Sequence, residues 1–498
     1  MSKKYVLAFD FGTSGVKAAV VSLEGELLGT GMGEYGLYMP HDGWAEQIPD
    51  EYWAGTCAAA KSVLEKCGVK AKDLEGLVFG TQWKGIIPVS AEGKVLRNSI
   101  IWLDSRAEAQ AQKINQHFGT ELYSGSDYWP KLMWLRENEP EVIDKAWMIF
   151  EINSYLKWRA CGACVMDISN CFVRSFDEEA DRNYQELFDF IGISRDKFPG
   201  YANCHEKVGY VTEQAAAELG IRPGVPVFAG CSDIAGIAIG SGQTKNGATH
   251  AYFGSSGWIG YCIPHGKCSV EASAYNSPFT DTKDISTPLG LNAAGLAINW
   301  VVDKLYAREK EELGGAVYDL LNEEVAKIPA GSEGLLAAPW FYGEVKPVFG
   351  PEARASFLNL GGHHTVAHMA RAVMEGVCYM VKATERYCAE DLDLHCTDVI
   401  SAVGGCALSD PMMQMLADIL NMTVYVPAQT RHAGTLGVAS CALVGLGVYK
   451  DFDEMAEKSH VERTYHPIAE NVKVYERGYQ VFKTLFKMQK PMFDMLNG

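Results

Sequence analysis

The first residues of the chain predict three short strands joined by tight turns. The β-prone runs are Tyr5 to Phe9, Val16 to Leu23 and Glu26 to Gly31, and the turns between them are Gly12-Thr13-Ser14-Gly15 and Glu24-Gly25. Neighbouring strands joined by such short turns run antiparallel. The chain is therefore expected to open with an antiparallel β-meander.

The pattern then changes to a helical repeat and back to a strand. Between Glu51 and Cys67, residues suited to a buried face recur at helical spacing, as Tyr52, Thr56, Ala59, Val63 and Leu64. Leu74 to Gly80 is an apolar strand that leads into Thr81-Gln82-Trp83-Lys84. A meander followed by alternating helices and strands predicts an α/β domain.

A related order of elements returns in the second half of the chain. Val227 to Asp233 is a predicted strand that ends in an acid, and Thr249 to Phe253 and Trp258 to Cys262 flank the turn Gly254-Ser255-Ser256-Gly257. This hairpin is similar to the one around Gly12 to Gly15, which indicates a weak internal duplication. Because 498 residues exceed the size of a single core, we expect two domains, 1–243 and 244–498.

The last predicted elements are two strands and two helices. Asp398 to Val403 is a strand, Gly404-Gly405 a turn, Pro411 to Leu420 a helix and Thr423 to Pro427 a strand. Ser409 can cap the helix that contains Pro411. The segment from Gly434 to Leu446 is predicted as the final helix, and its many small residues allow close packing.

Composition and charge narrow the choice of function. Hydrophobic residues make up 48% and charged residues 21% of the chain, as in a folded soluble protein. The formal net charge of −18 and the lack of Lys/Arg runs argue against nucleic-acid binding. The start, Met1-Ser-Lys-Lys4 followed by Tyr5 to Phe9, reaches Asp10 too early for a signal peptide, and no run of 18 apolar residues suggests a membrane span. We expect a cytoplasmic protein.

The 14 cysteines are interpreted as small buried hydrophobes rather than as a disulfide framework. Cys161 and Cys164 have a suggestive spacing, with Cys171 close by. A zinc site would need a second pair or histidines at ligand spacing, and the neighbourhood has neither.

Two Gly- and hydroxyl-rich turns are candidate phosphate loops. In the first, Asp10 ends a strand and the chain enters Gly12-Thr13-Ser14-Gly15, whose backbone N–H groups and hydroxyls can face phosphate oxygens. Asp10 can hold Mg²⁺ directly or through water. The second turn, Gly254 to Gly257, offers the same groups. The alternative for the first turn is an ordinary hairpin.

Asp233 is the candidate general base. It follows a strand on a turn of small residues, at the start of an apolar helix. A carboxylate at such a junction can accept the proton of a hydroxyl that attacks phosphorus. The alternative is that Asp233 only caps the helix.

The chain resembles the FGGY family of carbohydrate kinases, in the actin, Hsp70 and sugar-kinase superfamily, from end to end. The matching motifs are Asp10 to Lys17, Gly43-Trp44-Ala45-Glu46-Gln47-Ile48-Pro49, Lys131 to Asn138, Gly254 to Gly257, Pro339 to Glu344 with Pro347, Pro351, Ala353, Arg354 and Phe357, and Gly404 to Pro411. The resemblance implies an α/β protein whose two actin-like, ribonuclease H-like domains flank a central catalytic cleft.

The resemblance also implies roles for individual residues. Asp233 would be the general base, and Asp10, with Asp233, would organise Mg²⁺. The residues that would bind ATP are Gly12, Thr13, Ser14, Lys17, Gly254, Ser255, Ser256, Gly404, Gly405, Cys406 and Ser409. Within the adenosine motif, Cys406 and Leu408 replace a Gly and a basic or polar residue that are frequent in the family.

The substrate-binding residues depart from the family patterns. Xylulose kinases tend to show Gln-Met-His-Gly and glycerol kinases Gln-Arg-Glu, where this chain has Gln82-Trp83-Lys84-Gly85. Trp83 can stack on a sugar face, and Lys84 can bind a hydroxyl or the carboxylate of an acidic substrate. The family's Trp-x-Asp-x-Arg element is kept as Trp102-Leu-Asp104-Ser-Arg106, in which Asp104 can accept hydrogen bonds from sugar hydroxyls. The alternative is a surface pair between Asp104 and Arg106.

The sequence thus predicts an ATP- and Mg²⁺-dependent kinase for a small sugar, with a ketopentose such as xylulose as the leading substrate. Kinases for erythritol, glycerol or gluconate follow closely, and Ile234, where xylulose kinases often carry Asn, weighs against a strict pentulose enzyme. An actin-like ATPase and a sugar sensor without turnover are the alternatives from another class. The oligomeric state stays open, with a homodimer as one option.

Overall fold

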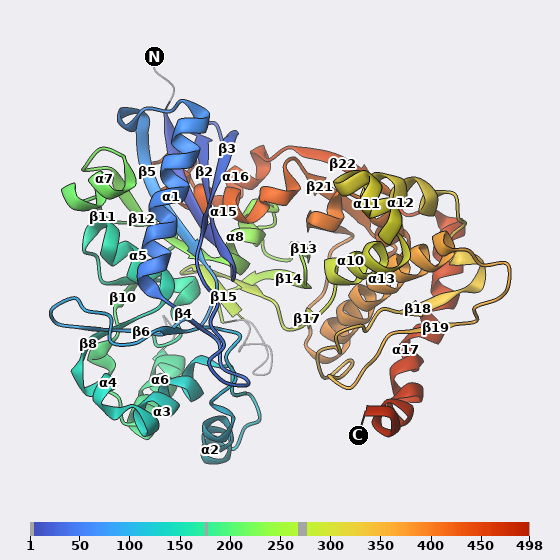
Figure 1. The fold of residues 1–498 in the computed structure, drawn as a ribbon, viewed down its shortest axis with the longest axis horizontal. Helices are drawn as coiled ribbons and strands as arrows, with labels where there is room; N and C mark the ends of the chain where they lie inside the picture. The colour runs from blue at the N-terminus through green and yellow to red at the C-terminus, as the bar shows by residue number, and fades with distance from the viewer. Residues whose placement is uncertain (1–3, 175–177, 267–275, 498) are drawn as a thin grey trace.

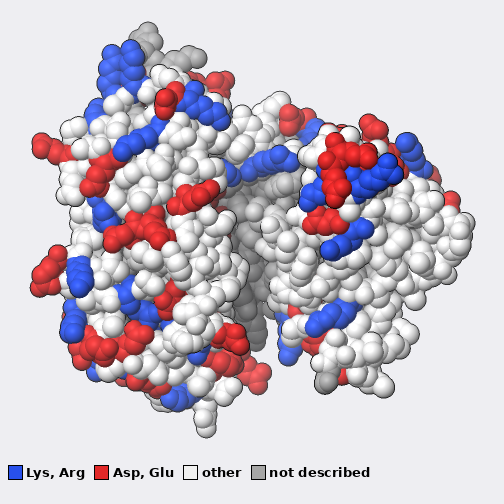
Figure 2. All heavy atoms as spheres, in the orientation of Figure 1, with Lys and Arg blue, Asp and Glu red and all other residues white. Residues whose placement is uncertain are grey.

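The structure is a computed structural model that describes residues 4–174, 178–266 and 276–497. The chain forms two halves, and a deep groove separates them on the face in Figure 2. Acidic and basic side chains are interspersed over both halves in this view. In the described part of the chain, no helix is both long and apolar enough to cross a membrane.

The first half is built on a six-stranded sheet with the order β11-β12-β5-β1-β2-β3. β1, β2 and β3 form an antiparallel meander, and β1, β5 and β12 run parallel. The strands are β1 (Tyr5–Phe11), β2 (Gly15–Ser22), β3 (Leu27–Glu34), β5 (Leu74–Thr81), β11 (Lys207–Tyr210) and β12 (Pro226–Ser232). The predicted opening meander is confirmed.

The second half repeats this arrangement around a larger sheet. Its order is β15-β16-β14-β13-β20-β21-β22, with β17 also paired to β14. The β13–β14 hairpin is antiparallel, and β13, β20 and β21 run parallel. The strands are β13 (Thr249–Phe253), β14 (Gly257–Pro264), β15 (Asn276–Thr280), β16 (Lys283–Ser286), β17 (Gly290–Leu291), β20 (Val399–Gly404), β21 (Thr423–Pro427) and β22 (Val461–Tyr465). The expected α/β fold with two actin-like halves is therefore confirmed.

Helices cover both sheets, and four short strand pairs complete the fold (Figure 1). In the first half the helices are α1 (Pro49–Cys67), α2 (Glu108–Phe118), α3 (Tyr128–Asn138), α4 (Pro140–Lys145), α5 (Ile152–Cys161), α6 (Glu178–Ile191), α7 (Glu213–Leu219) and α8 (Asp233–Gly240). In the second they are α10 (Gly295–Leu305), α11 (Ala307–Leu313), α12 (Val317–Ala326), α13 (Val366–Asp391), α14 (Asp410–Leu420), α15 (Ala433–Gly445), α16 (Phe452–Lys458) and α17 (Ala469–Asn497). The short pairs join β4 (Glu46–Gln47) to β7 (Ser99–Ile100), β6 (Ile87–Ser90) to β8 (Ala146–Phe150), β9 (Val165–Asp167) to β10 (Gly200–Ala202), and β18 (Leu336–Ala338) to β19 (Ser356–Leu358).

The first sheet is covered on its two faces by helices from different halves. Because side chains alternate along a strand, Leu7 and Phe9 of β1 face a core that includes residues of α1 and α5, whereas Val6 and Ala8 face the opposite side. On that opposite side the cover is α15, which contacts β1, β5 and β12. The core there runs on to Cys262 and Ile285 of the second sheet. The division at residues 243 and 244 therefore stays a prediction, since one core spans it.

The helices α8 and α15 cross at very short range between the two halves. A Cβ atom on Gly437 of α15 would lie 1.8 Å from the carbonyl oxygen of Gly236, and one on Gly240 of α8 would lie 1.8 Å from that of Ala433. No side chain fits at either position, so the expected close packing of the small-residue helix is observed. That helix is not the final one, however. The chain continues through α16 and α17, and α17 is anchored by buried side chains such as Tyr475 and Phe482.

Candidate active site

The parallel strands of the first sheet bring three predicted site residues to one edge. Asp10 is near the end of β1, Gln82 directly follows β5, and Asp233 directly follows β12. In the strand register, Phe11 lies beside Thr81 and Thr81 lies beside Ser232. The carboxyl ends of the three strands therefore meet, which is the usual position of ligand sites in open α/β sheets.

Asp233 is the first residue of α8, but it does not cap that helix. The cap is Ser232, whose Oγ accepts a hydrogen bond of 3.2 Å from the backbone N of Ala235. The Asp233 Oδ1 atom accepts one from the backbone N of Ile234 at 3.0 Å. Burial, followed by repulsion from the Asp10 carboxylate, raises the pKa of Asp233 to about 7. A carboxyl group with this pKa is suited to exchange a proton near neutral pH.

Asp10 is held by the start of α15. Thr435 Oγ1 donates a hydrogen bond of 2.9 Å to Asp10 Oδ2, and Gly434 lies directly beside the same oxygen. The amino-terminal ends of α8 and α15 thus both meet the carboxylate pair, where the helix dipole favours negative charge. Sequence reasoning missed Thr435, because 425 residues separate it from Asp10.

The first predicted phosphate loop is closed by its own backbone and leaves two of its residues accessible. The Gly12 N–H donates to the carbonyl of Gly15 at 3.1 Å, and Gly12 and Ser14 are exposed. Lys17 follows on β2, directly opposite Asp10 in the strand register. The loop therefore has donors that are free to face a ligand.

A chain of hydrogen bonds ties this loop to the predicted sugar-binding residues. Thr13 Oγ1 donates to Gln82 Oε1 at 3.4 Å and accepts from Trp102 Nε1 at 3.2 Å. Gln47, which is fully buried, donates to the Thr13 carbonyl and accepts from Gln82 Nε2, both at 2.7 Å. The loop and the substrate wall are therefore connected directly by hydrogen bonds. Gln47 was visible only as part of a family motif, and no spacing rule indicates its bridging role.

The second phosphate loop opens onto a cavity of about 550 Å³ in the second half. Five predicted ATP-binding residues line it: Gly254, Ser255, Gly405, Cys406 and Ser409. Its other walls include Asn299, Tyr318, Asn322, Met374 and Arg431. This volume is within the usual range for a small-molecule site. Ser256 is exposed on the same loop, next to Ser255.

Local geometry explains why glycine stands at position 404 and serine at position 409, beside this cavity. Gly404 has a φ of 103°, and a Cβ atom there would lie 2.3 Å from the carbonyl oxygen of Phe253. Ser409 caps α14, as predicted, through a bond of 3.3 Å from the backbone N of Met412, and it also donates to Asn322 at 2.6 Å. Burial raises the pKa of Cys406 to about 12, so this residue is a neutral thiol at physiological pH.

Trp83 and Lys84 form the wall beside Gln82. Trp83 is buried against Phe172, with an edge-to-face contact of 5.5 Å between ring centroids. Lys84 has a φ of 61°, and its Nζ lies 2.5 Å from Asp127 Oδ1. Beneath it, the buried Lys131 donates to the carbonyls of Lys84 and Ile101, each at 3.0 Å. Burial, with Lys84 nearby, lowers the pKa of Lys131 to about 7.

The structure places Asp104 inside the protein rather than facing the groove. Both of its oxygens accept hydrogen bonds from Arg106 at 2.7 to 3.0 Å, and Oδ2 also accepts from the backbone N of Ala45 at 2.6 Å. The two side chains are fully buried, so the pair is not the surface pair of our alternative either. Asp104 has no carboxylate oxygen left for a sugar, because Arg106 and the backbone occupy both. By contrast, Trp102 is 43% exposed.

Comparison with protein families matches both halves. The N-terminal domain of the FGGY family of carbohydrate kinases matches residues 5–240, and its C-terminal domain matches residues 251–446. A xylulose kinase of Bacillus subtilis (strain 168) is 27% identical over 506 residues, which cover 99% of each chain. A gluconokinase of the same strain is 27% identical over 512 residues, which cover 99% of this chain and 97% of the relative.

A solved structure supports the same fold. The crystal structure of a ligand-bound xylulose kinase from Lactobacillus acidophilus superimposes with a TM-score of 0.85 at 23% identity, and it covers 99% of this chain and 100% of its own. Its fold matches along the whole length, and the two family domains together account for most of the sequence. The chain therefore belongs to the FGGY family of carbohydrate kinases, and it is an ATP-dependent sugar kinase.

Proposed function

We propose that this kinase phosphorylates a hydroxyl of a ketopentose such as xylulose, with Asp233 as the general base. The observation that carries the proposal is the Asp233 carboxyl group, which has a pKa raised to about 7 and lies beside Asp10 where three parallel strands end. The relative from Bacillus subtilis (strain 168) that is named xylulose kinase supports this choice of sugar. A kinase that consumes ATP also fits a cytoplasmic location.

The reaction needs one proton acceptor and well-placed donors. The Asp233 carboxylate accepts the proton of the attacking sugar hydroxyl while that oxygen bonds to the terminal phosphorus of ATP. The bond from this phosphorus to the bridging oxygen breaks, and ADP leaves. Ser14, Ser255 and Ser256 donate hydrogen bonds to the phosphate oxygens, and Lys17 adds positive charge. Thr13 lies in the same loop, where its hydroxyl is bound to Gln82 and Trp102.

Asp10 and Asp233 fit a hard divalent cation such as Mg²⁺. The two carboxylates lie close enough that the charge of one raises the pKa of the other, and a cation between them would relieve this repulsion. In the described ranges no three His, Cys, Asp or Glu side chains form a ready metal cage. Mg²⁺ usually binds one or two carboxylates together with substrate phosphates and water, and Asp10 and Asp233 can supply the carboxylates. When bound, the ion neutralises phosphate charge and fixes the triphosphate.

We place the nucleotide in the 550 Å³ cavity and the sugar next to Gln82 and Trp102. Gly405 and Cys406 line this cavity and allow close approach of the adenosine, Gly404 forms the turn directly before them, and Ser409 stabilises the wall behind. Trp102 offers an exposed ring that can stack on a sugar face, and Trp83 and Lys84 shape the far end of the site. The domains 1–243 and 244–498 would close over both ligands and exclude water.

A sugar acid is the second candidate. Its specific support is Lys84, whose ammonium group lies at the substrate wall and whose present partner is Asp127. A substrate carboxylate could replace Asp127 as the partner of Lys84. The relative named gluconokinase is compatible with this alternative.

The test is coupled ADP release with Mg·ATP against xylulose, ribulose, erythritol, erythrulose, glycerol and gluconate, with a control that lacks sugar. We expect xylulose to give the highest kcat/KM, and Asp233→Asn to lower kcat by at least about a hundredfold for every responding sugar. A full rate without sugar would instead support an actin-like ATPase. If Asp233→Asn keeps the native kcat, Asp233 is not the base.

A further inference from the structure

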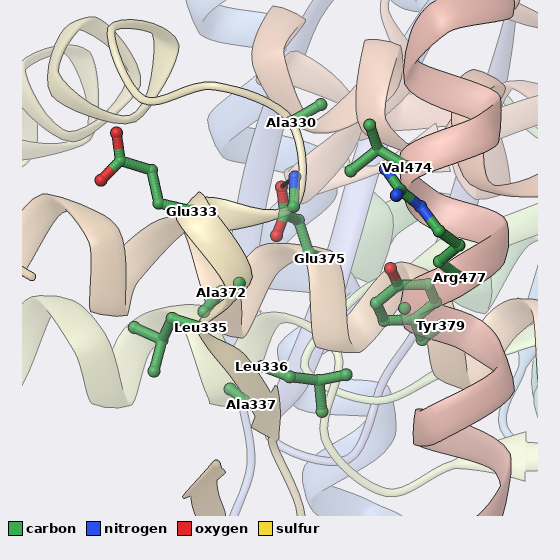
Figure 3. Close-up of a pocket in the computed structure, with 13 residues that line it drawn as sticks. Ala330, Glu333, Leu335, Leu336, Ala337, Ala372, Glu375, Tyr379, Val474 and Arg477 are labelled. Carbon is green, nitrogen blue, oxygen red and sulfur yellow. Dashed lines mark hydrogen bonds between the residues drawn. The ribbon is translucent and has the colours of Figure 1, made fainter. Parts of the chain in front are cut away.

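A second cavity, of about 470 Å³, lies in the second half among α13, α17 and β18 (Figure 3). Val474 and Arg477 extend from α17 on one side, and Ala372, Glu375 and Tyr379 belong to α13. None of the residues predicted to bind ATP or sugar lines it. It is therefore separate from the site described above.

The buried acid of this cavity is already fully matched. Glu375 pairs with Arg371 at 2.8 Å and accepts further hydrogen bonds from Tyr475, Ser332 and the backbone N of Gly331, at 2.8 to 3.0 Å. Four donors on one carboxylate compensate its burial. Glu375 therefore needs no additional positive charge from the cavity.

Arg477, unlike Glu375, has no hydrogen-bond or ion-pair partner in the described ranges 4–174, 178–266 and 276–497. It is an exposed residue at the edge of the cavity. The other charged lining residue, Glu333, lies 3.5 and 3.6 Å from the Nε2 atoms of His368 and His363. Arg477 is thus the basic residue of the wall, and its guanidinium has no acidic partner among the described residues.

The rest of the wall is mainly apolar. Leu335, Leu336 and Ala337 lie along β18 and its approach, and Ala372 and Val474 face them from the helices. A ligand matched to this wall has an apolar body and one anionic group, since guanidinium binds carboxylates and related oxyanions in a fork geometry. We propose that this cavity binds a small amphipathic organic anion, with its anionic group on Arg477 and its apolar body against Leu336, Ala337 and Val474.

The cavity shares α13 with the nucleotide cavity. Met374 of α13 lines the 550 Å³ cavity, while the neighbouring Glu375 lines this one. Consecutive residues of a helix point about 100° apart, so the two cavities lie against different faces of α13. We expect its binding to change the apparent affinity for ATP, and by thermodynamic reciprocity ADP changes the affinity of the ligand.

The probe for the test is 8-anilinonaphthalene-1-sulfonate, an amphipathic anion whose fluorescence rises in apolar pockets. It is titrated into the full chain with saturating ADP, so that the nucleotide cavity is occupied. We expect saturable binding that octanoate displaces and the uncharged octan-1-ol displaces at least tenfold less well. Arg477→Gln should weaken binding about tenfold, and Ala330→Trp, which fills the cavity mouth, should abolish it.

Lys473→Gln is the matched control, because Lys473 is exposed on the same helix and does not line the cavity. It should bind the probe within twofold of the native protein. The proposal is overturned if no saturable binding occurs, or if Arg477→Gln and Ala330→Trp both bind the probe like the native chain. Circular dichroism and kinase activity show that each variant is folded.

Discussion

The carboxyl groups of Asp10 and Asp233 are kept close together although each would be more stable alone. Their proximity and burial raise the pKa of Asp233 to about 7, and the starts of α8 and α15 partly offset the cost. Such strain is typical of functional sites, where stability is lower than it could be. This has a measurable effect on stability.

Asp233→Asn should make the protein more stable at alkaline pH. A folded-state pKa above the unfolded value means that the folded protein resists ionisation, so the native chain loses stability as the pH rises from about 4 to about 7. The asparagine variant does not undergo this loss. After allowance for the partial exposure of the side chain, we expect a gain of about 2 kcal/mol at pH 8 and less than half of that at pH 5. Chemical denaturation at both pH values measures the difference, and an equal effect at the two pH values would contradict it.

Trp102→Ala should weaken sugar binding without loss of fold. Loss of a stacked aromatic face costs about 1–3 kcal/mol, so the KM for the sugar should rise roughly tenfold or more while the KM for ATP changes little. Trp147→Ala is the matched control, because both rings are 43% exposed and Trp147 lies on β8, outside the residues assigned to the site. If the two variants have the same KM for the sugar, Trp102 does not contact it.

The position of a site residue could be predicted where the residues next to it in sequence determine the local structure. Asp10, Asp233 and the glycine turns follow strands, so their position at a sheet edge could be inferred from the local pattern. Asp104 could not be placed in this way, because the fold buries Arg106 against it and a free carboxylate is indistinguishable in sequence from a paired one. Thr435 and Gln47 reach the site only through tertiary contacts.

Among the elements, the crossing of α8 and α15 depends most strictly on residue size. Their backbones approach so closely that only glycine fits at Gly240 and Gly437. Both helices begin at the carboxylate pair, so a change in their packing also changes the distance between Asp10 and Asp233. The packing of this pair therefore affects stability and catalysis together.

Gly437→Ala should lower both stability and kcat. Its Cβ would lie 1.8 Å from the carbonyl oxygen of Gly236, which forces the helices apart at a cost of roughly 1–3 kcal/mol or more. Gly200→Ala is the control, since a Cβ there meets no atom within 4 Å and its φ is not in the left-handed region. Thermal melting and steady-state kinetics measure both effects. A Gly437→Ala variant that melts like Gly200→Ala would show that the crossing can relax freely.

Strands and helices that are bounded by clear turn or cap residues were predicted well. Thr249–Phe253 and Thr423–Pro427 have the bounds that the turn residues indicated, and the helix after Ser409 begins where its cap requires. The end of the chain was not predicted, because α17 has a mixed pattern in which Tyr475, Tyr479 and Phe482 are buried by contacts with α13 and the 330–340 region. Local periodicity does not indicate such partners.

For the whole molecule, the groove between the halves suggests a closing motion. The residues that we propose to bind the sugar belong to the first half, and the cavity that we propose to bind the nucleotide belongs to the second, so we expect the halves to approach each other during the reaction. The α8–α15 pair lies between them, so we expect its packing to limit how far the halves can move. On the face in Figure 2, acidic and basic groups are mixed on both halves.

We expect small-angle X-ray scattering to show a decrease in the radius of gyration when sugar and a non-hydrolysable ATP analogue are both present. Either ligand alone should give a smaller decrease, because each contacts mainly one half. The same measurement on Gly437→Ala tests the role of the α8–α15 pair, since its forced-apart helices should reduce the change. An unchanged radius with both ligands would indicate that the halves are already closed.

Because α15 of the second half covers one face of the first sheet, the chain cannot be cut between its halves without exposing a core. A fragment that ends at residue 243 contains the whole first sheet but lacks Val438, Ala439 and Ala442, which cover one face of it. In return, α8 of the first half contacts β15 and β16 of the second. Neither fragment should be soluble when expressed alone, whereas the two expressed together should reassemble.

If the halves arose by duplication, a single ancestral copy would have needed a second copy to cover its own sheet with a swapped helix, so the ancestor would have been a homodimer.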